Sequence, residues 1–480
     1  MKKPVVVGLA LLLAACGTPA SNKKDKDPVP NDFRMSPQAG TPPLNFAPTS
    51  LAPERVLLRG GTVMPASGPA LENGWVLMEE GRILEVGSGA KEAPEGFTVV
   101  DTTGKFVTPG VIDTHSHLGV YPSPWAEAHS DGNEIVGPTT PDVRAEHGLW
   151  PQDPGFERAL AGGVTTQQVI PGSANLIGGR GITIKSHPAI SSRAMQFPGA
   201  PYGLKMACGE NPKRVYGSKG GPGTRMGNMA VWRAKWAKAV EYKKKIEDYE
   251  KEFIRWDRGT RDATKEPTPP GRDIGLETMV AVLNDEILVH VHCYRADEML
   301  QVLQLADEFG FRVRSFHHAV EAYKIRDVLA EWNVSVSTWA DWWGFKMEAH
   351  DAVVENAALV SDAGGRAIIH SDSPIGIQRL NQEAAKVYFA ALEGGLELTE
   401  EEVLRWITLN PAWALGVHEQ TGSLEAGKMA DVVVWSAHPF SVYARAEMVF
   451  VDGVREFDQA APSRWSDFEV YQLPGQEVGQ

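Results

Sequence analysis

The chain has 480 residues and an ordinary globular composition, 42% hydrophobic and 22% charged, so it can bury a large core. The formal net charge is −14 and there is no block of basic residues, which argues against nucleic acid as a partner. Three cysteines are too few for a disulfide framework in a chain of this length.

The first sixteen residues have the pattern of an export signal. A basic start precedes an apolar run, residues 5–13, that is too short to span a membrane. Small residues then lead to Cys16, and this arrangement resembles the lipobox of bacterial lipoproteins, in which the cysteine is lipidated. We therefore expect residues 1–16 to be a lipoprotein signal peptide, with the protein exported and lipid-anchored to a bacterial membrane, in the periplasm or at the cell surface. The alternative is an ordinary signal peptide with an incidental cysteine.

The next segments differ in pattern. Residues 17–50 are rich in Pro, Lys, Asp, Ser and Asn and lack hydrophobic periodicity, which predicts a flexible linker. Residues 51–108 contain short apolar runs separated by turn residues, and residues 417–460 show the same pattern. We expect these two flanks to form one composite β-sandwich.

Residues 109–416 alternate candidate buried strands with helical stretches. This alternation predicts an α/β fold, a parallel (β/α)8 TIM barrel. The eight predicted strands are residues 111–117, 164–170, 182–185, 203–208, 287–293, 312–317, 334–338 and 367–370. An apolar stripe at helical spacing predicts the clearest helix at residues 228–257. Cys208 and Cys293 fall in predicted core strands, so we expect them to be buried free thiols.

Histidines and a carboxylate stand at the ends of several predicted barrel strands. His115 and His117 occupy alternate positions, so both side chains leave the same side of the first strand and could bind one metal ion. Active sites of such barrels lie at the carboxyl ends of the strands. The set predicts a divalent metal site that favours Zn²⁺. The other members are Lys205, His290, His292, His317, His318 and Asp372.

These motifs resemble the amidohydrolase superfamily of metal-dependent hydrolases. Within it the chain is similar to the imidazolonepropionase-related and Xaa-dipeptidase-like group. The resemblance covers about residues 51–454. The matching pieces are residues 109–117 and 162–166, His292, His318 followed by Glu321, Ser371-Asp372, and residues 422–431.

The resemblance implies a centre with one or two divalent ions. His115 and His117 would bind the more buried ion, and His292 and His318 would bind the second. Asp372 would contact the buried ion and act as the general base. Strand parity does not choose between His317 and His318, but the Glu321 that follows His318 in the family pattern favours His318.

A bridging ligand is expected where two metals are bound. Binuclear members often use a carboxylated lysine, and Lys205 occupies the expected position. Glu210, just past the same predicted strand, is the competing bridge. The extension at residues 209–214 departs from simpler members and leaves the choice between these two ligands open.

The implied activity is hydrolysis of a C–N bond in a small amide, dipeptide or cyclic amide by hydroxide activated at the metal. Arg180, Arg225 and Arg295 lie on predicted loops after strands and are candidates to pair with a substrate carboxylate. His290 shares a strand face with His292 and is a candidate substrate contact or support. The alternatives are a deaminase on the same barrel and a non-catalytic ligand-binding lipoprotein. The expected partners are a small-molecule substrate and the membrane, and the sequence allows a homo-oligomer.

Overall fold

A computed structural model describes residues 52–260 and 265–461 of the chain. They fall into two compact units, one holding residues 246–270 and the other the rest of the described chain. The predicted helix at residues 228–257 is confirmed as α4 (Arg225–Asp257), which contributes to both units. The predicted signal peptide with Cys16 and the predicted linker lie outside the described residues. Within the described ranges, none of the helices is long and apolar enough to cross a membrane.

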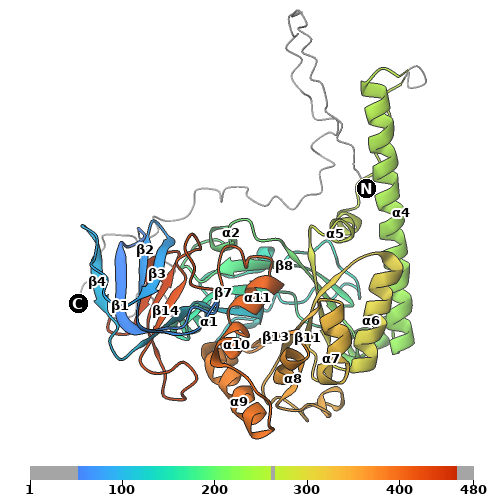
Figure 1. The fold of residues 1–480 in the computed structure, drawn as a ribbon. Helices are drawn as coiled ribbons and strands as arrows, with labels where there is room; N and C mark the ends of the chain where they lie inside the picture. Colours follow the sequence, from blue (N-terminus) through green and yellow to red (C-terminus); the bar gives the residue numbers. More distant parts are fainter. Residues whose placement is uncertain (1–51, 261–264, 462–480) are drawn as a thin grey trace, which may run out of the picture. The chain divides into compact units, whose positions relative to one another are not determined.

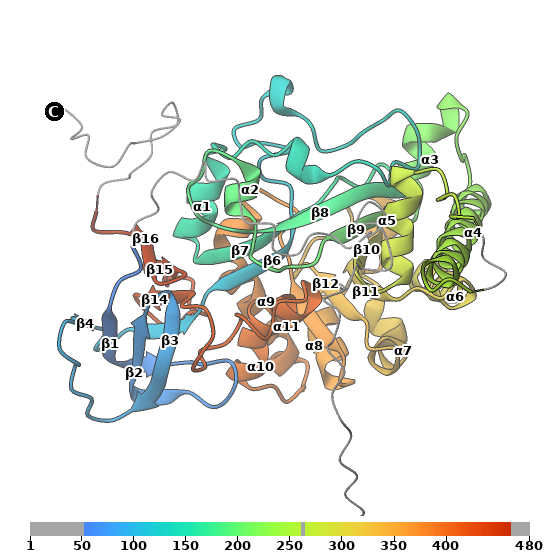
Figure 2. The same cartoon turned by 90° about the horizontal axis from the view of Figure 1, so that it is seen from above.

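Eight strands lie side by side in chain order and form the barrel sheet (Figure 2). They are β6 (Val111–Ser116), β7 (Val164–Val169), β8 (Ile177–Lys185), β9 (Gly203–Ala207), β10 (Leu288–Cys293), β11 (Val313–His318), β12 (Ser335–Thr338) and β13 (Arg366–Ile369). This arrangement confirms the predicted α/β barrel.

Helices follow most of the barrel strands and lie around them (Figure 1). The helices other than α4 are α1 (Gly155–Ala161), α2 (Ser192–Met195), α3 (Glu210–Tyr216), α5 (Ile274–Leu283), α6 (Ala296–Phe309), α7 (Arg326–Glu331), α8 (Asn356–Asp362), α9 (Leu380–Glu393), α10 (Glu400–Arg405) and α11 (Leu409–Ala414).

One barrel strand runs in the opposite direction, so the prediction of a wholly parallel barrel is wrong. Strand β8 pairs antiparallel with both β7 and β9. Only residues 170–176 connect β7 to β8, and a parallel connection needs a crossover of about a dozen residues or more. The chain therefore turns back directly, and β8 contains Arg180, which we had expected on a loop.

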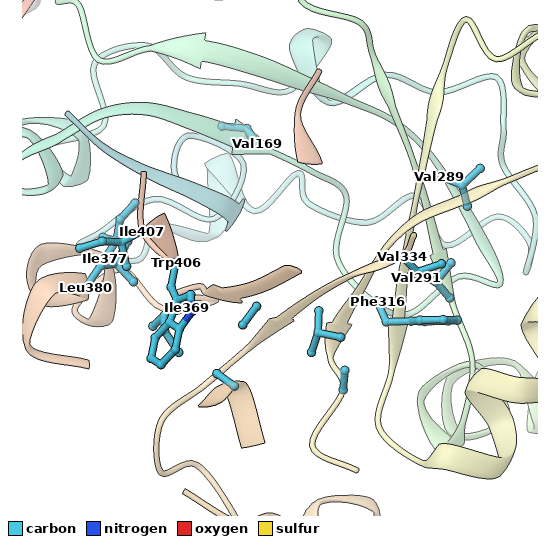
Figure 3. Close-up of a cluster of buried hydrophobic side chains, with 14 of the residues drawn as sticks. Val169, Val289, Val291, Phe316, Val334, Ile369, Ile377, Leu380, Trp406 and Ile407 are labelled. Carbon is cyan, nitrogen blue, oxygen red and sulfur yellow. The ribbon is translucent and has the colours of Figure 1, made fainter. Parts of the chain in front are cut away.

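Side chains alternate between the two faces of the barrel strands. One face packs in the main hydrophobic core, and the other lines the barrel interior. Val289 and Val291 of β10 are buried in the main hydrophobic core together with Phe316 of β11 (Figure 3). The residues between these valines and after Phe316 are histidines, which alternation places on the other face. The outer face of these two strands thus stabilises the fold while the inner face carries histidines.

A second sheet joins the two flanks of the chain. Its strand order is β16-β15-β14-β5-β1-β2-β3, with β4 paired to β1. Strands β5 and β14 pair antiparallel and so connect the flanks directly. The strands are β1 (Val56–Val63), β2 (Leu71–Glu79), β3 (Arg82–Ser88), β4 (Thr98–Asp101), β5 (Phe106–Pro109), β14 (Val432–Trp435), β15 (Ala446–Val451) and β16 (Val454–Asp458).

A disulfide bond joins Cys208, just after β9, to Cys293, the last residue of β10. The expectation of two free thiols is therefore wrong. The two strands pair in parallel, with His292 opposite Ala207. This register brings the two cysteines together although they are 85 positions apart in the sequence.

A partly buried ionic cluster lies where β8 ends beside the second sheet. The Lys185 ammonium contacts Asp431 at 2.6 Å and Asp452 at 2.9 Å. His187 contacts Glu456 through Nδ1 at 2.9 Å and Asp452 through Nε2 at 3.3 Å. Burial opposes protonation of His187, but the hydrogen bonds and charges of the two carboxylates outweigh it and raise its pKa to about 9.

Replacing His187 by glutamine should destabilise the protein at pH 6 and much less at pH 9.5. A raised pKa stabilises the fold fully below the unfolded value of 6.5, and this contribution is lost as pH rises through about 9. We expect the free energy of unfolding to fall by about 1–3 kcal/mol at pH 6, measured by urea denaturation. The exposed His147 offers a control, His147→Gln. An equal loss for His187→Gln at both pH values would contradict the expectation.

Candidate metal centre

Two imidazoles and a carboxylate meet at the carboxyl end of β6. His115 Nε2 and His117 Nε2 are 3.2 Å apart, as the alternation along the strand predicted. The Oδ1 atom of Asp372 is 3.2 Å from His117 Nε2 and 3.6 Å from His115 Nε2. His117 Nδ1 donates a hydrogen bond to the carbonyl oxygen of Ile170 at 2.8 Å, which leaves Nε2 as the nitrogen that can hold a proton or a metal ion. A ring nitrogen and a carboxylate oxygen at this distance fit a cation between them.

Asp372 is held in an unusual backbone conformation. Its φ angle is +47°, in the left-handed region that side chains other than glycine rarely adopt. Its backbone N–H donates to the carbonyl oxygen of His115 at 3.0 Å, which fixes the loop after β13 to β6. Burial alone would raise the pKa of the Asp372 carboxyl, but the contact with His117 and neighbouring charges lower it. The carboxylate is therefore ionised at neutral pH.

His292 and His318 form a second pair beside the first. Their ring centroids are 4.4 Å apart, and His318 Nδ1 is 3.9 Å from Asp372 Oδ2. Among the described residues, His292 Nδ1 and both ring nitrogens of His318 have no hydrogen-bond partner. Burial lowers the pKa of both rings well below the usual value, so they are neutral. Buried neutral imidazoles with unused nitrogen atoms suit metal binding.

The backbone explains why both neighbours in the His317-His318 pair face inward. His318 has a φ angle of +69° and the next residue, Ala319, has +38°. This left-handed turn ends the strand and interrupts its alternation, so His318 packs on His292 while His317 contacts His115 and His290 inside the barrel. The regular alternation of side chains along a strand could not have predicted that both histidines face inward.

Lys205 joins the cluster, whereas Glu210 is paired elsewhere. Lys205 is buried, and its Nζ atom is 3.3 Å from His115 Nε2 and 3.1 Å from the carbonyl oxygen of Pro171. Burial lowers the pKa of this amine to about 7. Glu210 begins α3, and its carboxylate lies 4.0 Å from the Lys346 ammonium.

The three candidate substrate-binding arginines are each engaged by neighbours. Arg180 Nε donates to Thr278 Oγ1 at 2.9 Å. Arg225, the first residue of α4, forms ion pairs with Glu298 and Glu348, and Arg295 pairs with Asp297 at 2.9 Å. Their role in substrate binding stays a prediction. His290 is buried inside the barrel, with Nδ1 2.9 Å from His317 Nε2.

Three residues near the centre were not predicted. Tyr294 stacks on His318 with a centroid distance of 5.1 Å, and the Lys346 ammonium lies 3.9 Å above the Tyr294 ring. Lys346 also donates to Asn211 Oδ1 at 3.3 Å, and Asn211 Nδ2 lies 3.5 Å from His292 Nε2. Tyr294 follows His292 by two positions and could have been inferred from that spacing, whereas Lys346 and Asn211 carry no local signal.

Comparison with known proteins agrees with this geometry. The model of the amidohydrolase family matches residues 106–456. The chain belongs to the amidohydrolase family. A solved relative of this amidohydrolase is the amidohydrolase from Thermotoga maritima MSB8, with 38% sequence identity and a TM-score of 0.73. That match covers 84% of this chain and 100% of the other.

Two curated relatives extend the comparison. The amidohydrolase tasK of Hapsidospora irregularis is 33% identical over 402 residues, a match that covers 80% of this chain but only 40% of the relative. An imidazolonepropionase of Alkaliphilus oremlandii is 24% identical over 418 residues, which covers 76% of this chain and 85% of the relative. The prediction of an amidohydrolase-type enzyme is thus confirmed, whereas its substrate is not identified.

Proposed function

We propose that this amidohydrolase uses divalent metal to hydrolyse a C–N bond in a small amide, dipeptide or cyclic amide. The supporting observation is the convergence of His115 Nε2, His117 Nε2 and Asp372 Oδ1 at the carboxyl ends of the barrel strands. The imidazolonepropionase relative is consistent with a cyclic amide among the substrates.

The donor set fits Zn²⁺. Nitrogen ligands about 2.0–2.1 Å from a tetrahedral zinc ion lie about 3.3 Å apart, close to the 3.2 Å between the His115 and His117 nitrogens. His115, His117 and Asp372 would hold one ion, and the unpartnered nitrogens of His292 and His318 support a second. When bound, such ions polarise a carbonyl group and acidify water.

Asp372 is the group placed to move the proton. Its ionised carboxylate can accept a proton from the attacking water and return it to the leaving nitrogen. The left-handed backbone, the hydrogen bond to His115 O and the contact with His117 Nε2 hold the carboxylate in place. No side-chain nucleophile is needed for this chemistry.

The class of substrate can be tested with the purified full chain. We expect it to retain metal and to release an amine and a carboxylate from members of a panel of N-acyl amino acids, dipeptides and cyclic amides. A chelator should abolish the activity and Zn²⁺ should restore it. Release of ammonia from aminated heterocycles without any amide hydrolysis would contradict the proposal and indicate a deaminase. Metal binding without turnover of any compound would indicate a binding protein.

Lys205 is proposed to carry a carboxylate that bridges two ions. A neutral buried amine can add to CO₂ to give a carbamate and release a proton, and the lowered pKa of Lys205 favours the neutral form. Its position 3.3 Å from His115 Nε2 favours it over Glu210.

Replacing Lys205 by alanine should therefore reduce the metal content from about two ions per chain to one or fewer, because a structural bridging ligand is removed. Metal analysis of the parent and the variant tests this, and short acids or bicarbonate added to the variant should restore part of the loss. Glu210→Ala is the matched comparison. Loss of metal in Glu210→Ala, with none in Lys205→Ala, would assign the bridge to Glu210.

Export, lipid anchoring at Cys16 and the division into domains are also proposals. The disulfide between Cys208 and Cys293 supports export, because disulfides persist in oxidising compartments. The composite sheet has its own apolar cluster, from Val56 of β1 to Phe450 of β15, which supports a sandwich in which the sheet folds over itself.

A further inference from the structure

A row of four polar side chains crosses the barrel interior from the metal centre. It begins at His115 on β6 and continues through His317 on β11 and His290 on β10 to Gln168 on β7. His115 Nδ1 is 3.0 Å from His317 Nδ1, and His317 Nε2 is 2.9 Å from His290 Nδ1. His290 Nε2 is then 3.5 Å from the Gln168 amide. All four residues have no exposed surface.

The direction of these hydrogen bonds follows from the first ring. His115 Nε2 faces His117, Lys205 and Asp372 and is the nitrogen turned toward the proposed metal centre. A nitrogen that binds metal carries no hydrogen, so the hydrogen of the neutral ring is on His115 Nδ1. That atom must donate to His317 Nδ1, and this step rests on the proposed function.

Each following step is then determined. His317 accepts at Nδ1, so its hydrogen is on Nε2 and is donated to His290 Nδ1. The hydrogen of His290 is therefore on Nε2 and needs an acceptor. Gln168 Oε1 is buried without a partner, while its amide nitrogen points toward His290. The oxygen and nitrogen of a glutamine amide are told apart only by their hydrogen-bond contacts. Exchanging them in Gln168 lets Oε1 accept the hydrogen of His290 Nε2, so the donor and the acceptor each gain a partner.

We propose that His317 and His290, anchored by Gln168 Oε1, are positioning residues that set the tautomer and orientation of the metal ligand His115. Hydrogen bonds of this kind orient a ligating imidazole and raise its basicity. His115, His317 and His370, the residue just after β13, bring ring nitrogens within 4.8 Å of one another, so His317 is also a candidate metal ligand. Both of its ring nitrogens are already used in the row, which favours the positioning role.

Two substitutions of His317 separate the roles. Asparagine places an acceptor oxygen near the position of Nδ1, whereas phenylalanine keeps the ring volume and removes the acceptor. With Zn²⁺ as the probe and a chelator as competitor, His317→Phe should weaken zinc binding by about 10–100-fold. His317→Asn should stay close to the parent. Ser315→Ala removes a buried hydroxyl from the same strand, outside the row, and is the control.

The outcomes separate this inference from the proposed function. If the parent chain binds no zinc, the proposed function fails. If the parent binds zinc and His317→Phe binds it equally well, the positioning role is overturned and the proposed function stands. Equal weakening of zinc binding in the asparagine and phenylalanine variants would also overturn the positioning role. It would show that zinc binding does not depend on a hydrogen-bond acceptor for His115 Nδ1.

A measurement on the parent covers the case in which the variants do not fold. ¹⁵N-histidine NMR of the zinc-loaded full chain should show hydrogen on Nδ1 of His115 and on Nε2 of His317 and His290. Hydrogen on Nδ1 of His290 would reverse the direction of the row and overturn the proposal.

Discussion

Replacing Asp372 by asparagine should lower kcat by about 10²–10⁴-fold, the range typical of losing a general base. The amide keeps the size of the side chain but cannot accept a proton from water at neutral pH. The measurement is steady-state hydrolysis of the best substrate at saturating Zn²⁺, with metal content determined on the same sample. Because the neighbouring imidazoles would still hold metal at the proposed centre, we expect the loss of activity to exceed any loss of metal.

A carboxylate on a neighbouring loop provides the matched control. Asp341 follows β12 and pairs with Lys386 at 3.0 Å, so Asp341→Asn removes a similar charge without touching the centre. The role of Asp372 as the base would be refuted by a variant that recovers full activity once additional zinc is supplied. Such recovery would make Asp372 a metal ligand only.

Removing the disulfide should cause the largest change in stability. Replacing both Cys208 and Cys293 by alanine frees a loop of 85 residues in the unfolded chain. Loop-closure entropy then predicts a fall of about 4.5 kcal/mol in the free energy of unfolding. Urea denaturation of the oxidised parent and the double variant measures this difference.

Reduction supplies an independent check on the disulfide. The parent unfolded in the presence of a thiol reductant should match the double variant, and the double variant should not respond to the reductant. If the oxidised and reduced parent proteins unfold at the same urea concentration, the disulfide does not stabilise this fold.

Much of the barrel could be predicted because its strands are marked by short apolar runs in a regular order. The direction of each strand could not be predicted in the same way, because the residues of β8 would form a strand in either direction. The antiparallel direction of β8 follows from the short connection after β7. The disulfide was also missed. Its two cysteines come together only through the register of β9 and β10, which no local pattern reports.

The candidate metal centre was predictable where its candidate ligands stand on regular strands. The spacing of His115 and His117 predicted their shared side, and the structure places their nitrogens 3.2 Å apart. His318 could not be separated from His317 because its left-handed backbone departs from strand alternation. Ion pairs between distant segments could not be predicted either. Arg225 pairs with Glu298 and Glu348, which lie far from it in the sequence.

The pairing of β5 with β14 has a consequence for synthesis of the protein. Trp435 donates a hydrogen bond to Thr108 across these strands, and the two residues are 327 positions apart. A ribosome adds about 5–20 residues per second, so the edge of β5 would stay unpaired for roughly 15–65 s until β14 has been synthesised. An open strand edge is a template for association with other chains. The nascent chain therefore leaves this edge of β5 unpaired until its last strands emerge, and truncation before β14 should yield aggregates.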